Sequence, residues 1–129
     1  MAIKVTHVDP EFVDERGGIA RVVDQDAFPM RAVLRITSKA GTKRANHVHK
    51  TDYHYIYIES GKCQYSEKDV NNPKSEVETV ILKSGDLVLT NPGIIHGVKF
   101  IEDTILYAFT SEKREQARYE KDIQRIEII

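Results

Sequence analysis

The stretch Gly41-Thr-Lys-Arg-Ala-Asn-His47-Val-His49-Lys-Thr-Asp-Tyr-His54, followed by Gly61, decides the fold of this chain. On a β-strand, residues two apart point to the same face, so His47 and His49 project together. A His-x-His pair by itself is more often a surface pair or a catalytic base than a metal site. The residues around it must therefore decide its role.

His54 belongs to a second strand with an apolar face. It alternates with Ile56 and Ile58, so it points into the interior if that face is buried. A hairpin between the two strands would place His54 across from His47 and His49. The sequence therefore predicts that three imidazoles lie close together.

A fourth histidine follows a Pro-Gly turn in Gly85-Asp-Leu-Val-Leu-Thr-Asn-Pro92-Gly93-Ile-Ile-His96. To lie beside the other three, it has to belong to a strand that is distant in sequence but close in the fold. Imidazole is the commonest side-chain ligand of first-row transition metals. We predict that one divalent ion (Zn, Mn, Fe, Ni, Co or Cu) is bound inside the fold. Its ligands would be His47, His49, His54 and His96.

The rest of the sequence has mostly strand character. Short apolar or alternating runs are separated by Gly, Pro, Asn and Asp, a pattern typical of an all-β sandwich or barrel. The predicted strands are Ile3–Val8, Ile19–Val23, Arg31–Thr37, Ala45–His49, Tyr53–Glu59, Cys63–Glu67, Glu76–Leu82, Asp86–Thr90, His96–Phe100 and Thr104–Thr110.

One segment favours a helix. Ser111–Lys121 is rich in helix formers, and Ser111 is a suitable cap. The tail Ile123–Ile129 alternates again and is expected to pair with a barrel edge or with a second subunit. No linker or repeat divides the chain, so residues 1–129 are expected to form one domain.

Composition limits the partners. The chain has 129 residues, a net charge of −1 and no basic stripe, which argues against nucleic acid as a partner. The single cysteine, Cys63, allows no intrachain disulfide and suits a reducing compartment. No segment is apolar enough for a signal peptide or a membrane helix, so we expect a cytoplasmic protein.

The two histidine motifs resemble those of the cupin superfamily. Gly41, His47, His49 and Gly61 have the spacing of the first cupin motif, and His54 stands where the family usually has glutamate. In the second motif, Gly85, Gly93 and His96 fit, while Asn91 replaces a proline and Phe100 an asparagine. The resemblance implies a double-stranded β-helix, the cupin jelly-roll barrel, with a short C-terminal helix and a four-histidine metal site.

A narrower resemblance concerns the substrate. Asp14-Glu-Arg16-Gly-Gly18, Arg44-Ala-Asn-His47-Val-His49-Lys50 and the segment Tyr119–Arg125 are similar to segments of RmlC-like sugar-nucleotide epimerases and ketoisomerases of surface-polysaccharide synthesis. The resemblance implies that His47 removes a proton from a keto-sugar and that His49 assists or shuttles it. It also implies that Arg44 meets a substrate phosphate with help from Arg16 and Lys50.

The proton donor is a tyrosine in this interpretation. Our candidate is Tyr55, with Tyr53, Tyr57, Tyr65 and Tyr107 as alternatives. The Tyr53, Tyr55 and Tyr57 stripe is also explained by packing between sheets or subunits.

Several alternatives stay open. If all four histidines bind metal, none is free to act as the base, and the ion would act as a Lewis acid in the isomerisation. Alternatively, a redox-active metal would make the protein a cupin oxygenase. The barrel could also be a non-catalytic module that binds a sugar or another small molecule. In every case we expect a homodimer, because small barrels bury exposed strand edges by pairing with a copy.

Overall fold

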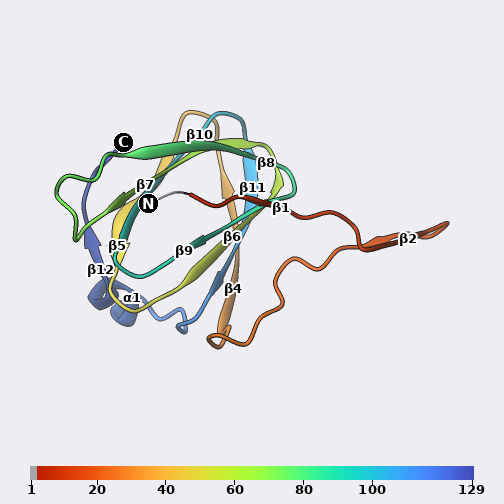
Figure 1. Ribbon diagram of the computed structural model, residues 1–129, viewed down its shortest axis with the longest axis horizontal. Coiled ribbons are helices and arrows are strands. Elements are labelled where there is room, and N and C mark those ends of the chain that lie inside the picture. The colour runs from red at the N-terminus through yellow and green to blue at the C-terminus, as the bar shows by residue number, and fades with distance from the viewer. Residues whose placement is uncertain (1–2) are drawn as a thin grey trace.

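The structure, a computed structural model, describes residues 3–129 as two five-stranded sheets that face each other (Figure 1). One sheet has the strand order β1-β9-β6-β11-β4. Its strands are β1 (Thr6–His7), β9 (Asp86–Thr90), β6 (His54–Ser60), β11 (Thr104–Thr110) and β4 (Ala32–Ser38). All pairs in this sheet are antiparallel.

The second sheet has the order β12-β5-β10-β7-β8 and is also antiparallel. Its strands are β12 (Ile123–Arg125), β5 (Lys43–His49), β10 (Ile94–Phe100), β7 (Lys62–Asp69) and β8 (Glu78–Lys83). The predicted all-β jelly-roll fold is confirmed.

The core lies between the two sheets and follows the alternation of the strands. Ile56 and Ile58 of β6 face Tyr65 of β7 and Phe100 of β10 across this layer. Ile56 and Phe100 also line the cavity that holds His47, His54 and His96, so this core borders the histidines directly. Cys63 is buried in the same cluster, where burial raises the pKa of its thiol to about 12.

The strand pairing corrects one expectation. β5 and β6 do not form a hairpin, because β5 pairs with β10 and β12 while β6 pairs with β9 and β11. His54 therefore reaches the other histidines from the opposite sheet. His96 is the residue directly opposite His47.

The C-terminal helix is shorter than predicted. It is α1 (Gln116–Asp122), and Glu115 rather than Ser111 precedes it. Ser111 instead donates its hydroxyl hydrogen bond to Asp52, a tertiary contact that sequence spacing does not reveal. The predicted tail strand is confirmed over β12, which pairs with β5 of the same chain.

The N-terminal region differs most from the prediction. Residues 20–23 form no strand, and a small hairpin of β2 (Phe12–Asp14) and β3 (Gly17–Ile19) projects away from the barrel (Figure 1). The hairpin forms a sheet of its own. In residues 3–129 no helix has the length and apolar character needed to cross a membrane.

Candidate functional site

A cavity of about 390 Å³ lies between the two sheets, on the side where β4 and β5 face each other. Both sheets line it, with Leu34 and Ile36 of β4 and Val98 of β10 as apolar walls. His47, His54 and His96 line the cavity as well, and His49 is buried directly beside them. The predicted convergence of four histidines from distant strands is therefore confirmed.

The imidazoles are in mutual contact. The ring centroid of His47 lies 4.7 Å from that of His49 and 4.8 Å from that of His96, and the His49 centroid lies 4.2 Å from that of His54. Each of the four residues is less than 9% exposed. The barrel thus holds a compact, buried group of nitrogen donors.

Asp52 fixes the orientation of His54. Its Oδ2 lies 2.7 Å from Nε2 of His54, and its Oδ1 accepts hydrogen bonds from the backbone and side chain of Ser111. Burial alone would raise the pKa of Asp52, but the bonds from His54 and Ser111 outweigh it and the pKa lies below its usual value. Asp52 is therefore a carboxylate, and Nδ1 of His54 is left with its lone pair.

Asp122 holds His49 in the same way. Its Oδ2 lies 2.9 Å from Nδ1 of His49, while Thr51 donates backbone and side-chain hydrogen bonds to Oδ1. Burial opposes ionisation of Asp122, but the bonds from Thr51 and His49 lower its pKa overall. The Nδ1 hydrogen of His49 is thus committed to Asp122, and its Nε2 carries the lone pair.

Two buried nitrogens in residues 3–129 have no hydrogen-bond partner: Nε2 of His49 and Nδ1 of His96. Unpaired buried polar atoms are rare because they are costly. His47, His49 and His96 offer ligand nitrogens that all lie within 4.8 Å of one another. The group therefore fits a divalent transition metal, with His54 beside it in a second group formed with His49 and Asp52.

His47, His49 and His96 are held neutral by their surroundings. Burial, reinforced by repulsion from the neighbouring imidazoles His49 and His54, lowers the pKa of His47 to about 3. Burial also lowers the pKa of His49 and places that of His96 well below its usual value. Neutral imidazole is the form that binds metal or accepts a proton.

The rim of the cavity carries three arginines. Arg35, Arg44 and Arg114 line it, and none of its described lining residues is acidic. Arg44 bridges the two sheets, because its guanidinium donates to Oγ of Ser38 (2.6 Å) and to the carbonyl oxygen of Thr37 (3.0 Å). This positive rim suits an anionic group such as a phosphate.

Tyr119 of α1 closes the cavity near His47. Its hydroxyl lies 3.5 Å from Nδ1 of His47, and the guanidinium of Arg114 stacks over its ring at 3.9 Å. Sequence reasoning missed Tyr119 and Arg114 as site residues. Arg35 was missed as well. Only the packing of α1 and β4 around the cavity reveals their roles.

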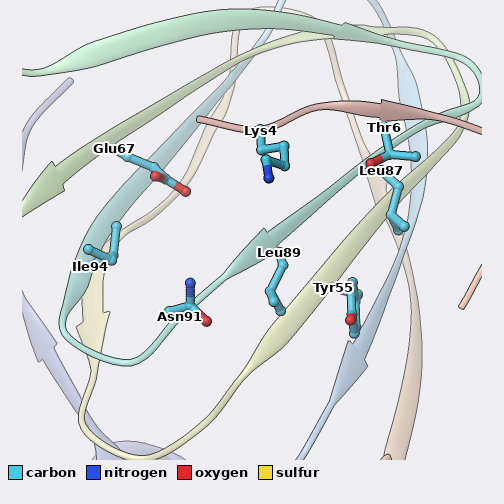
Figure 2. A pocket seen from close by; sticks show the side chains of 8 residues that line it. All are labelled: Lys4, Thr6, Tyr55, Glu67, Leu87, Leu89, Asn91 and Ile94. Carbon is cyan, nitrogen blue, oxygen red and sulfur yellow. The ribbon is translucent and has the colours of Figure 1, made fainter. Parts of the chain in front are cut away.

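Tyr55, the predicted proton donor, does not line the cavity that holds the histidines. Its partners across the sheet, Leu89 of β9 and Phe109 of β11, lie on the outer face, and its ring stacks on Phe28. Figure 2 shows Tyr55 in a separate pocket of about 290 Å³, beside Leu87 and Leu89. The outer-face packing interpretation of the tyrosine stripe agrees with this position.

The other tyrosine of interest, Tyr65, does face the interior, with its ring centroid 6.3 Å from that of His96. Its hydroxyl donates to Glu67, and burial places its pKa well above the usual value. Tyr65 therefore packs beside the histidines with its proton directed to Glu67.

Two predicted substrate-binding residues do not reach the cavity of their own chain. Arg16 is exposed on the projecting hairpin and pairs with Asp14. Lys50 is exposed just beyond β5 and is absent from the residues that line the cavity. Of the three predicted phosphate ligands, the structure brings only Arg44 to the histidines.

We compared the sequence with family models and with curated proteins. The model of the cupin domain matches residues 34–111, more than half of the chain. No curated protein matches the sequence.

Three solved structures illustrate the similarity. A 3,4-ketoisomerase from Helicobacter canadensis is 18% identical, with a TM-score of 0.77 over 97% of this chain and 91% of the other. A mutant of the 3,4-ketoisomerase QdtA from Thermoanaerobacterium thermosaccharolyticum, in complex with TDP-4-keto-6-deoxyglucose, is 16% identical (TM-score 0.75; 95% and 86% covered).

The third is the RmlC epimerase of Mycobacterium tuberculosis, which is 16% identical (TM-score 0.79; 98% and 73% covered). The family match covers both histidine motifs, and the fold is that of RmlC-like epimerases and 3,4-ketoisomerases. The chain belongs to the cupin domain family, with an RmlC-like fold.

Proposed function

We propose that this protein is an isomerase or epimerase of a nucleotide-linked keto-sugar. The observation that carries the proposal is the pairing of His47 and Tyr119 in a cavity rimmed by three arginines and free of described acidic lining residues. The similarity in fold to ketoisomerases and an epimerase of nucleotide sugars supports it.

The reaction needs a base and an acid. A base removes the proton from the carbon beside the ketone, and an acid protonates the oxygen of the resulting enolate; the reverse transfers then place a proton on a different carbon or face. His47 opens onto the cavity beside the Tyr119 hydroxyl, so we assign it as the base. The Tyr119 hydroxyl, 3.5 Å from Nδ1 of His47, is placed to act as the acid.

The arginines bind the diphosphate that links sugar to nucleoside. A guanidinium presents paired donors that match phosphate oxygens. Arg35 and Arg44 come from the two strands that flank the opening, and Arg114 lies just before α1 on the same rim. They would bind the diphosphate at the rim while the sugar extends inward to His47.

The test uses TDP-4-keto-6-deoxyglucose in D₂O, with the sugar protons followed by NMR. We expect deuterium to enter at a carbon adjacent to the ketone, and we expect exchange to be lost in His47→Asn and to fall in Tyr119→Phe by about 10²-fold or more. His7→Asn is the matched control, because His7 is half exposed and pairs with Asp86 outside the cavity. Exchange that persists in His47→Asn would remove His47 as the base.

A metal site is the second candidate property, favoured by the two unpartnered nitrogens of His49 and His96. His47, His49 and His96 would hold the ion, with His54 beside them as the fourth donor. A bound divalent ion would supply a Lewis acid that polarises the ketone oxygen. His47 would then be a ligand, and Tyr119 and the arginines would still orient the substrate.

Elemental analysis of untagged protein separates these possibilities. Near-stoichiometric transition metal that is lost in His96→Asn, with no loss in His7→Asn, supports the metal site. Less than about a tenth of an equivalent, with no uptake on titration, contradicts it. Iron accompanied by oxygen consumption would favour a cupin oxygenase over an isomerase.

We also propose a homodimer formed through the projecting hairpin. Phe12, Val13 and Ile19 of the hairpin are 51%, 67% and 63% exposed, and an isolated two-stranded hairpin is only marginally stable in water. β4 is the outer strand of its sheet, so it offers an unpaired edge. A second copy could pair with this edge through its hairpin, and exchange between two copies gives a closed two-fold dimer.

A further inference from the structure

Strand β5, which carries Arg44, His47 and His49, has one residue more than its partner β10 over the stretch where the two strands pair. In the pairing of β5 with β10, His47 lies opposite His96 but Ala45 lies opposite Gly97, so Asn46 has no partner on β10. Ala45 and Asn46 both have left-handed backbones, with φ of 66° and 55°. Together they form a β-bulge, a feature that re-aims side chains beside functional sites.

The bulge decides which side chains face the cavity. In an unbroken strand, Arg44 and His47 would point to opposite faces, because they are three positions apart and side chains alternate from one residue to the next. The extra residue shifts the register so that Arg44 lies opposite Val98, whose side chain belongs to the core. Arg44 and His47 consequently line the same cavity.

The C-terminal tail holds the bulge from outside. The Asn46 side-chain oxygen accepts hydrogen bonds from the backbone amides of Ile128 (3.0 Å) and Ile129 (3.2 Å). The Asn46 carbonyl oxygen accepts one from the amide of Ile126 (2.9 Å). One residue is thus bonded to the tail through both its side chain and its backbone.

The opposing strand makes room for this contact. A Cβ atom on Gly97 would lie 2.8 Å from Oδ1 of Asn46 and 2.9 Å from Cγ1 of Ile129, so only glycine fits there without displacing them. Asn46 also suits its own position, because asparagine tolerates the left-handed region better than most residues. Asn46, Gly97 and the tail therefore form one packed unit behind the cavity.

We propose that Asn46, bonded to tail residues 126–129, is the positioning residue that makes Arg44 and His47 share one cavity. The placement of Arg44 follows from the geometry alone, whereas its effect on substrate affinity rests on the proposed function. Asn46 itself is not among the residues that line the cavity, so it would act through the register of β5.

Four variants test the proposal. Asn46→Gly keeps the left-handed backbone but removes the side-chain acceptor, and deletion of residues 126–129 removes the donors. Ile128→Pro removes a single donor and keeps the tail, which guards against loss of folding in the larger changes. Asn72→Gly is the control, because Asn72 also accepts a backbone amide, that of Lys74, but in the loop between β7 and β8.

The first readout needs no ligand. Arg44 and Val98 are cross-strand partners, so nuclear Overhauser effects should join their side chains in the wild type and in Asn72→Gly. We expect these effects to weaken in Ile128→Pro and to disappear in Asn46→Gly and in the deletion variant. If they persist unchanged in all three while only the melting temperature falls, the tail is structural and the proposal is overturned.

The second readout is the affinity for TDP, measured by calorimetry. We expect about a tenfold loss in Asn46→Gly and in the deletion variant, with no further loss when the two are combined. Additive losses would show that Asn46 and the tail act separately, against the proposal. If the wild type binds no TDP, the nucleotide-sugar function fails, and the nuclear Overhauser effects alone decide the role of Asn46.

Discussion

Asp122 Oδ2 lies 2.9 Å from His49 Nδ1, although 73 residues separate the two in sequence. β12 begins at Ile123 and pairs with the end of β5, and this pairing carries Asp122 to the histidine. The contact leaves Nε2 of His49 as the unprotonated, unpartnered nitrogen.

We expect Asp122→Asn to disturb the site without unfolding the barrel. The amide can donate as well as accept, so it no longer enforces the protonated Nδ1 of His49. Substituting such a supporting partner typically costs about 10 to 100-fold in metal affinity or activity. Metal titration and deuterium exchange measure both effects, and Asp69→Asn, at the end of β7, is the control. Wild-type values in Asp122→Asn would show that the contact does not tune His49.

We expect Ala45→Gly to stabilise the protein. A left-handed residue other than glycine costs roughly 1–2 kcal/mol, and the gain exceeds the roughly 0.4–1 kcal/mol by which glycine favours the unfolded chain. Urea denaturation should show a small rise in the free energy of unfolding. Ala40→Gly, which relieves no left-handed backbone, should show a fall. If Ala45→Gly lowers the free energy of unfolding as much as Ala40→Gly does, the left-handed backbone of Ala45 is not strained.

We expect stability to decline in acid because of the histidine cluster. The pKa of His47 is about 3 in the folded protein and about 6.5 when unfolded, so the unfolded chain binds the extra proton first. The stabilisation is complete above about pH 6.5 and is lost progressively as the pH falls toward 3. Melting temperatures from pH 7.5 to 4.5 should fall less steeply in His47→Gln than in the wild type. Parallel curves would show that His47 contributes nothing to the decline.

We expect the hairpin to control the oligomeric state. Light scattering coupled to gel filtration should give a dimer for the wild type and a monomer for the double variant Phe12→Ser and Ile19→Ser. Ile81→Ser is the control, because Ile81 is 51% exposed on β8 and lies in the other sheet. A monomeric wild type at micromolar concentration would refute the dimer.

The sequence by itself determined the barrel and the convergence of its four histidines. Period-two alternation is local, so β9 and β11 were predicted with their observed bounds, and His54 was correctly placed on the face it shares with Ile56 and Ile58. Likewise, the spacing of His47 and His49 was enough to place both on one face of the strand, and the structure shows that this face is buried.

Only the tertiary structure decided what surrounds those histidines. Alternation would turn Arg44 outward, and the bulge at Asn46 reverses it, because one extra residue shifts every side chain beyond it to the other face. Tyr119 and Asp122 reach the site through the docking of α1 and β12, which no local pattern encodes. Contacts between elements far apart in sequence depend on how whole sheets pack, and that packing separated Tyr55 on the outside from Tyr119 at the cavity.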